Sequence, residues 1–186
     1  LKNSNYRSEN TSDLKNDKNN IEFMGAASLL TSLPLEKRSD NYKKTLTPKL
    51  MLRTAPGHMR NMSDSTLKLS MLNLYSLNKL ADIDIIETGT SLTLGTDYSY
   101  KDKNDFEKFN LSVGQVFNYD DNADMSRQST LNEKTSELVG NINYYLNEFS
   151  NVGYKFSLDN DYSTLNYNEI SGIFKINKLV TNFEYL

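Results

Sequence analysis

The sequence predicts an all-β fold: an antiparallel transmembrane β-barrel segment with about eight long strands of a larger barrel. Three observations predict this fold. Apolar and polar residues alternate over long runs, aromatic residues gather near the ends of those runs, and the connections between runs alternate in length. Transmembrane strands of about 9 to 11 residues, with interfacial aromatic girdles and a polar interior, produce such a pattern.

The clearest alternation covers residues 90–100, where Leu and Tyr occupy one face and Ser, Thr, Gly and Asp occupy the other. Residues 109–119 repeat the pattern, and only Val116 places an apolar side chain on the polar face. Most runs span about 10 to 13 residues, whereas strands of soluble proteins have a mode near 5 or 6. Further candidate strands cover residues 45–53, 138–146, 152–158, 170–176 and 179–185, with a less regular one at 21–31.

The connections are long at 56–84 and 120–134, medium at 161–165, and short in between. Outer-membrane barrels alternate short periplasmic turns with longer extracellular loops, so we expect the long connections outside the cell. The connection at 32–42 is longer than this scheme predicts. Residues 1–20 are almost entirely polar and predict a mobile extracellular loop, which leaves residues 21–186 as the middle part of the barrel domain.

Composition excludes several function classes. A net charge of −3 argues against a nucleic-acid partner, and no apolar run approaches the length of a transmembrane helix. With no cysteine and one histidine, we expect no cofactor, no metal site and no catalytic residue. His58 is predicted to be a solvated loop residue, Asp159 and Asp161 lack the further ligands of a calcium loop, and the acidic run at 120–124 is predicted to be solvated.

The two faces of the predicted strands give two sets of candidate residues. A closed barrel directs its polar face to the lumen and its apolar face to lipid. We therefore expect a cation at Thr93 or Ser112 to be tolerated better than one at Leu94 or Leu111. The predicted lumen-facing residues are Lys49, Arg53, Thr93, Asn110, Lys155 and Lys175. The predicted lipid-facing residues are Leu92, Leu94, Leu111, Val113, Phe156 and Phe174.

Three stretches resemble a known family. They are Tyr-Lys-Lys-Thr-Leu-Thr-Pro-Lys-Leu at 42–50, Leu-Asn-Leu-Tyr-Ser-Leu-Asn-Lys-Leu at 72–80 and Phe-Asn-Leu-Ser-Val-Gly-Gln-Val-Phe at 109–117. In this order and spacing they resemble the C-terminal barrel of the LptD family, also called OstA or Imp. The similarity extends from about Tyr42 to the end and includes residues 137–140, 156–160 and 165–169.

The resemblance implies a middle portion of a barrel of about 26 strands. It implies transport and assembly of lipopolysaccharide, with delivery to the outer leaflet of the Gram-negative outer membrane. The implied partners are lipopolysaccharide, an LptE-like plug lipoprotein, outer-membrane lipids and a periplasmic lipopolysaccharide bridge reached through an N-terminal domain missing from this sequence.

Alternatives remain open from the residues alone. A general outer-membrane porin or receptor barrel shares the alternation, and so does a soluble all-β adhesin or lectin. Apolar residues also recur near helical spacing between 67 and 80, which is typical of an amphipathic partner helix. The resemblance instead places this stretch in an extracellular loop that folds over or into the barrel, and packing is the interpretation that we favour.

Overall fold

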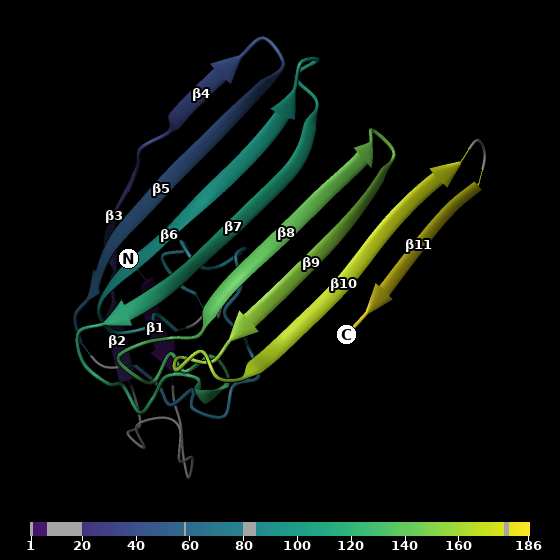
Figure 1. Ribbon diagram of the computed structural model, residues 1–186. Helices are drawn as coiled ribbons and strands as arrows, with labels where there is room; N and C mark the ends of the chain where they lie inside the picture. Colours follow the sequence, from purple (N-terminus) through teal and green to yellow (C-terminus); the bar gives the residue numbers. More distant parts are fainter. Residues whose placement is uncertain (1, 7–19, 58, 80–84, 177–178) are drawn as a thin grey trace.

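The computed structural model describes residues 2–6, 20–57, 59–79, 85–176 and 179–186. Its main body is a nine-stranded antiparallel sheet, accompanied by a separate two-stranded hairpin (Figure 1). The hairpin consists of β1 (Lys2–Tyr6) and β2 (Asn20–Met24). The sheet consists of β3 (Ala27–Ser32), β4 (Leu35–Ser39), β5 (Tyr42–Ala55), β6 (Gly89–Asp102), β7 (Glu107–Asn118), β8 (Leu138–Asn147), β9 (Ser150–Leu158), β10 (Leu165–Ile176) and β11 (Leu179–Tyr185).

The sheet is a meander in which strands that follow one another in sequence lie side by side. Its order is β11-β10-β9-β8-β7-β6-β5-β3, and β4 also pairs with β5. The all-β antiparallel fold is therefore confirmed. Because β3 and β4 both pair with β5, they act as two halves of one interrupted strand, and the sheet then has the predicted eight long strands.

Proline explains the interruption between β3 and β4. The gap falls at Leu33 and Pro34, opposite Pro48 in the middle of β5. Since proline has no N–H to donate, continuous pairing cannot pass this point, and a single hydrogen bond from Leu33 N to Pro48 O (3.1 Å) spans it. The remaining connection is the tight turn at residues 40–41, so the apparent long connection at 32–42 contains a strand.

The N-terminal part differs from its prediction. Residues 2–6 form β1 within the expected polar loop, because backbone pairing with β2 does not require apolar side chains. The candidate strand at 21–31 is divided at Gly25 and Ala26 into β2 and β3. Residues 7–19 lie outside the described residues.

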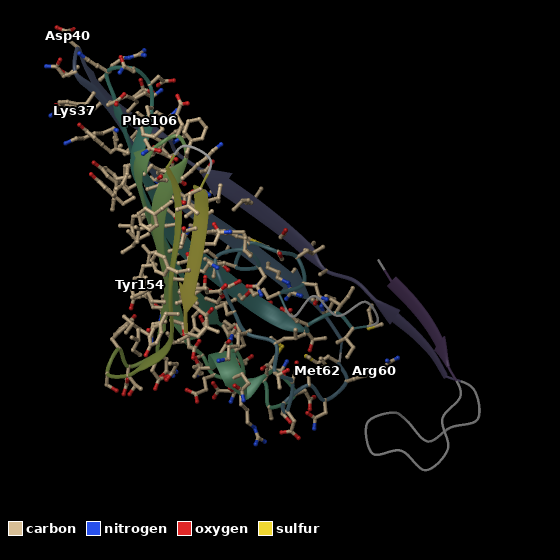
Figure 2. All side chains as sticks on the ribbon, turned by 90° about the vertical axis from the view of Figure 1, so that its right-hand side faces the viewer. Lys37, Asp40, Arg60, Met62, Phe106 and Tyr154 are labelled. Carbon is tan, nitrogen blue, oxygen red and sulfur yellow. The ribbon has the colours of Figure 1, made fainter. Side chains whose placement is uncertain are left out.

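The two ends of the sheet carry different connections. We call the end with the turns at 40–41, 103–106 and 148–149 the turn end, and the end with the connections at 56–88, 119–137 and 159–164 the loop end. Figure 1 shows the long connections gathered at one end of the sheet. In Figure 2, Lys37, Asp40 and Phe106 lie at the turn end and Met62 and Arg60 at the loop end. The described residues contain no helix long and apolar enough to span a bilayer.

Candidate functional site

Strand register divides the sheet into two faces. We call the face that carries Met51, Thr93 and Val116 the packed face, because residues of the long connections pack against it, and the opposite face the bare face. Residues directly opposite in register share a face. The packed face holds all the predicted lumen-facing residues: Lys49, Arg53, Thr93, Asn110, Lys155 and Lys175.

The bare face is predominantly apolar along the middle of the strands. It holds all the predicted lipid-facing residues: Leu92, Leu94, Leu111, Val113, Phe156 and Phe174. Leu94 is 40% exposed in this structure. Its register partners are Leu50 on β5 and Gln115 on β7. A sheet face of exposed leucine and aromatic side chains is stable only when another apolar phase covers it.

Two glycines on the packed face make room for the long connection at 56–88. Gly95 and Gly114 lie opposite one another on β6 and β7. A Cβ at Gly114 would collide with Leu74, and one at Gly95 would collide with the Tyr75 hydroxyl and with the Val113 carbonyl oxygen. Both glycines are therefore required by close approach rather than by a turn.

A hydrophobic core lies between this loop and the sheet. Leu74 and Val116 are both fully buried, and Val116 is the apolar exception that the alternation showed on the polar face. The core occupies the loop end of the packed face. Its buried members are Met59, Leu69, Leu74, Ile85, Val116, Met125, Leu131 and Val139.

The segment at 59–79 reaches this core without forming a helix. Leu69 and Leu74 are buried, whereas Leu67 and Leu77 are partly exposed, so a single amphipathic helical stripe does not describe the burial. The packing interpretation is confirmed for the described part of this stretch, and Leu80 lies outside it.

A second long connection holds the first in place. Backbone bonds run from Met62 N to Asp124 O (2.7 Å) and from Arg127 N to Ser63 O (3.3 Å). The hydroxyl of Ser129, in the short 3-10 helix η1 (Arg127–Ser129), accepts from Leu69 N at 2.7 Å. The two long connections therefore form one covering unit over the sheet.

A buried charged cluster anchors both limbs of the 56–88 connection. Arg53, on β5, donates from Nε to Leu77 O at 2.7 Å and from its terminal guanidinium nitrogen to Glu87 O. Lys79 and Glu87 are also buried. Because Arg53 binds a carbonyl from each limb, it connects the outgoing and returning chain, and it is unavailable to a passing ligand.

The pKa of Lys79 makes the seating of this connection dependent on pH. Burial lowers the pKa of the Lys79 ammonium to about 8; the negative charge of Glu87 opposes this shift and the positive charge of Arg53 adds to it. An unseated Lys79 has an ordinary pKa near 10.5, so the unseated state binds more protons between pH 8 and 10.5. Raising the pH through this window therefore stabilises the seated state.

We expect protease cleavage within residues 56–88 of the full-length protein to slow as pH rises from about 8 to 10. Burial raises the pKa of Tyr75 from 10.0 to about 12, with Asp97 acting in the same direction, so above pH 10 the unseated tyrosine ionises first and opposes the effect of Lys79. Lys79→Met should abolish the pH dependence, while the exposed Lys68→Met should retain it. The same pH profile in Lys79→Met as in the unmodified protein would show that another group controls the seating.

Polar groups line the packed face beside the covering loops. Lys49, in the middle of β5, pairs with Asp97, and nearer the loop end the Lys155 ammonium on β9 pairs with Glu169 on β10 at 2.7 Å. The second oxygen of Glu169 accepts from the Tyr167 hydroxyl at 2.6 Å. A groove of about 410 Å³ lies between this pair and residues 68–72.

Amide side chains extend the polar lining toward the turn end. Asn143 donates to the Asn110 side-chain oxygen at 2.9 Å, and Asn110 donates to Glu107 at 3.1 Å and to the Tyr145 hydroxyl at 3.2 Å. Such a ladder offers both donors and acceptors to a sugar or phosphate group. Thr93 differs from this open set because it is completely buried beneath the loops.

Carboxylates of the second connection bind the third connection and the two strands that it joins. Asn160 donates to Glu133 at 2.6 Å, and buried Glu137 accepts from Ser157 Oγ on β9 (2.8 Å) and from Asn166 Nδ2 on β10 (2.7 Å). At residues 159–164, a bond from Tyr162 N to Asp159 O forms a turn. In the described part of the chain no group of three or more His, Cys, Asp or Glu could hold a metal ion, and His58 lies outside it.

Two residues of the site, Tyr75 and Lys79, were missed from sequence. They belong to a connection in which spaced leucines were the only periodic signal. Two signals in the sequence do point to the packing: Val116 on an otherwise polar face, and a glycine at the same level of each of two paired strands. Read together, they indicate a covering segment at that level of the sheet.

Long antiparallel strands with one apolar and one polar, charged face, tight turns at one end and long connections at the other, define the wall of an outer-membrane β-barrel. The family model described as "LPS transport system D" matches residues 1–186. The chain belongs to this family, LptD, whose members are lipopolysaccharide transporter barrels of the Gram-negative outer membrane rather than enzymes.

A curated relative agrees with this membership. The LPS-assembly protein LptD of Vibrio cholerae serotype O1 (strain ATCC 39315 / El Tor Inaba N16961) is 27% identical over 164 residues, which is 79% of this chain and 21% of that protein. The chain therefore spans about a fifth of the length of the curated relative that it matches.

Proposed function

We propose that this chain forms part of the wall of a barrel that delivers lipopolysaccharide to the outer leaflet of the outer membrane. In this proposal the packed face lines the lumen and the bare face meets membrane lipid. The observation that carries it is the separation of the two faces in register, with Lys155, Glu169 and Asn110 on one and leucine and aromatic side chains on the other. No covalent bond is made or broken.

The part of the packed face beside the covering loops suits the polar head of lipopolysaccharide. Hydroxyl and phosphate groups of the head exchange hydrogen bonds with amides and paired charges at little net cost. The long connections fill the loop half beside β5, β6 and β7, so the route in this segment follows the faces of β8, β9 and β10. The acyl chains remain in the apolar phase outside.

We propose an orientation with the long connections outside the cell and the tight turns in the periplasm, supported by the difference in their lengths. An LptE-like lipoprotein as lumenal plug, and a periplasmic bridge that supplies lipopolysaccharide through an N-terminal domain, complete the proposal for the full-length protein. Their support is the family membership alone.

Photo-crosslinkers at neighbouring positions test the route. In full-length protein, crosslinkers at Asn110 and Lys155 should trap lipopolysaccharide in a manner that requires the upstream energy-driven machinery. Crosslinkers at Leu111 and Phe156, one residue away on the opposite face, serve as matched controls. Energy-independent adducts that form only at the controls would mean ordinary contact with boundary lipid and would contradict a lumenal route along this segment.

A further inference from the structure

We propose that Lys37 and Lys44, together with Tyr42 and Tyr100, bind the phosphate group of an anionic phospholipid in the periplasmic leaflet. The site lies on the bare face at the turn end and is distinct from the lumenal route. It rests on the proposed function in two respects: the bare face meets lipid, and the turn end is periplasmic.

Strand register brings these residues together from three adjacent strands. Lys37 on β4 lies directly opposite Lys44 on β5, and Lys44 lies directly opposite Tyr100 on β6. The Lys44 ammonium is 4.9 Å from the centre of the Tyr42 ring and 5.8 Å from that of Tyr100. The centres of the two tyrosine rings lie 6.2 Å apart, so both rings lie close to the ammonium.

The two lysines are a like-charged pair that needs an anion. Like charges directly opposite on neighbouring strands destabilise the pairing. Among the described residues, neither ammonium has an acidic ion-pair partner. By contrast, Lys43 on the packed face pairs with Glu36 at 2.7 Å.

Lys108, another cation at the turn end, does not share this feature, because its ammonium is 3.9 Å from Asp102 and contacts the Leu146 carbonyl oxygen. An external phosphate oxygen between Lys37 and Lys44 would supply the missing charge, because ammonium groups donate strongly to phosphate.

Depth in the bilayer selects a lipid headgroup as the source of this anion. The ten residue steps from Lys44 to Thr54 span about 33 Å along β5. At a strand tilt of about 40°, this length covers about 25 Å of membrane, which is the usual height of the apolar band. Leu46, Leu50 and Leu52 fill the interval on the bare face, so Lys44 lies at headgroup level. Figure 2 shows Lys37 close to the turn-end extremity of the sheet, beside Asp40.

Lipid retention by the full-length protein tests the site. The purified protein is equilibrated in bilayer discs of equal phosphatidylglycerol and phosphatidylcholine with identical acyl chains, and the lipids that it retains in detergent are counted by mass spectrometry. The unmodified protein should retain phosphatidylglycerol preferentially. Each surface lysine adds about fivefold to affinity for anionic lipid, so Lys37→Gln with Lys44→Gln should reduce the preference about thirtyfold.

A matched pair controls for total charge. Lys43→Gln with Lys101→Gln removes two register partners at the same end but on the packed face, and should leave the preference unchanged. Lys37→Arg with Lys44→Arg should keep it. High salt should abolish it in the unmodified protein, which tests the site even if the glutamine variant fails to fold.

The proposal is overturned by an unchanged preference in the glutamine pair, by an equal loss in the packed-face pair, or by a preference that survives high salt. It is also overturned if added lipopolysaccharide displaces phosphatidylglycerol and this displacement depends on Lys37 and Lys44. Lipopolysaccharide crosslinking at Lys155 is measured on the same variants. Loss of crosslinking with intact lipid preference contradicts only the proposed function, and loss of preference with intact crosslinking is the result expected for a separate lipid site.

Discussion

Replacing Gly95 with alanine is expected to disrupt both the sheet and the covering loop, although the change adds a single methyl group. That methyl would lie about 2.5 Å from the Val113 carbonyl oxygen and would collide with the Tyr75 hydroxyl. The backbone carbonyl cannot rotate away, so we expect an overpacking cost of about 1 to 3 kcal/mol. The measurement is the yield of heat-modifiable full-length barrel in membranes together with protease cleavage within residues 56–88.

Two other glycines make the result specific. Gly114→Ala should leave the barrel formed but speed the cleavage about tenfold, because its methyl displaces Leu74 from a fully buried position. Gly153→Ala is the control, because its methyl meets only the side-chain ends of Ser171 (2.9 Å) and Asn143 (3.0 Å), which can rotate. Equal damage at Gly153 would show that the effect belongs to strand glycines in general and not to the loop seat.

Arginine at Leu111 is expected to prevent barrel assembly, whereas arginine at the next residue should be tolerated. Leu111 lies at the middle of β7 on the bare face, between Tyr98 and Ile142 in register. A cation there costs about 2 to 4 kcal/mol at the membrane midplane. Ser112 lies on the packed face between Asp97 and Asn141, where a guanidinium gains a carboxylate neighbour.

The measurement is again the fraction of heat-modifiable barrel, now with Leu111→Met as a control for loss of the leucine shape. Comparable failure of Leu111→Arg and Ser112→Arg would mean that the two faces of β7 do not differ in their tolerance of a cation, and the proposed assignment of the faces would then be wrong.

The division of the sheet into two faces could be predicted because it is a local property. Side chains alternate along a strand whatever lies around it, so the positions of Lys155 and Phe156 on opposite faces followed from their neighbours in sequence. The interruption at Pro34 and Pro48 was missed because it depends on two prolines that come to neighbouring positions on paired strands only when the register is known.

Burial within the polar face could not be predicted from alternation. Thr93 was expected to accept an arginine, yet it is fully buried between Met51 and Val116, which are its register partners on β5 and β7. An arginine there would have to displace the hydrophobic core of the covering loops, so that expectation is wrong for Thr93. It remains a prediction for Ser112. The cause is long-range: residues 59–79 bring no regular period of their own, and their position depends on glycines far along the chain.

The meander has a consequence for the order in which the segment folds. Apart from β3, which pairs with β5, every strand of the sheet pairs with a neighbour in sequence, so each pair can form before the next strand arrives. The loss of loop entropy is small at the tight turns and larger at the connections 56–88 and 119–137. The core under the 56–88 connection has a different requirement, since it includes Val116 from β7 and Val139 from β8. We therefore expect this connection to pack only after β6, β7 and β8 have formed, so that the covering loop closes late, after stepwise growth of the sheet.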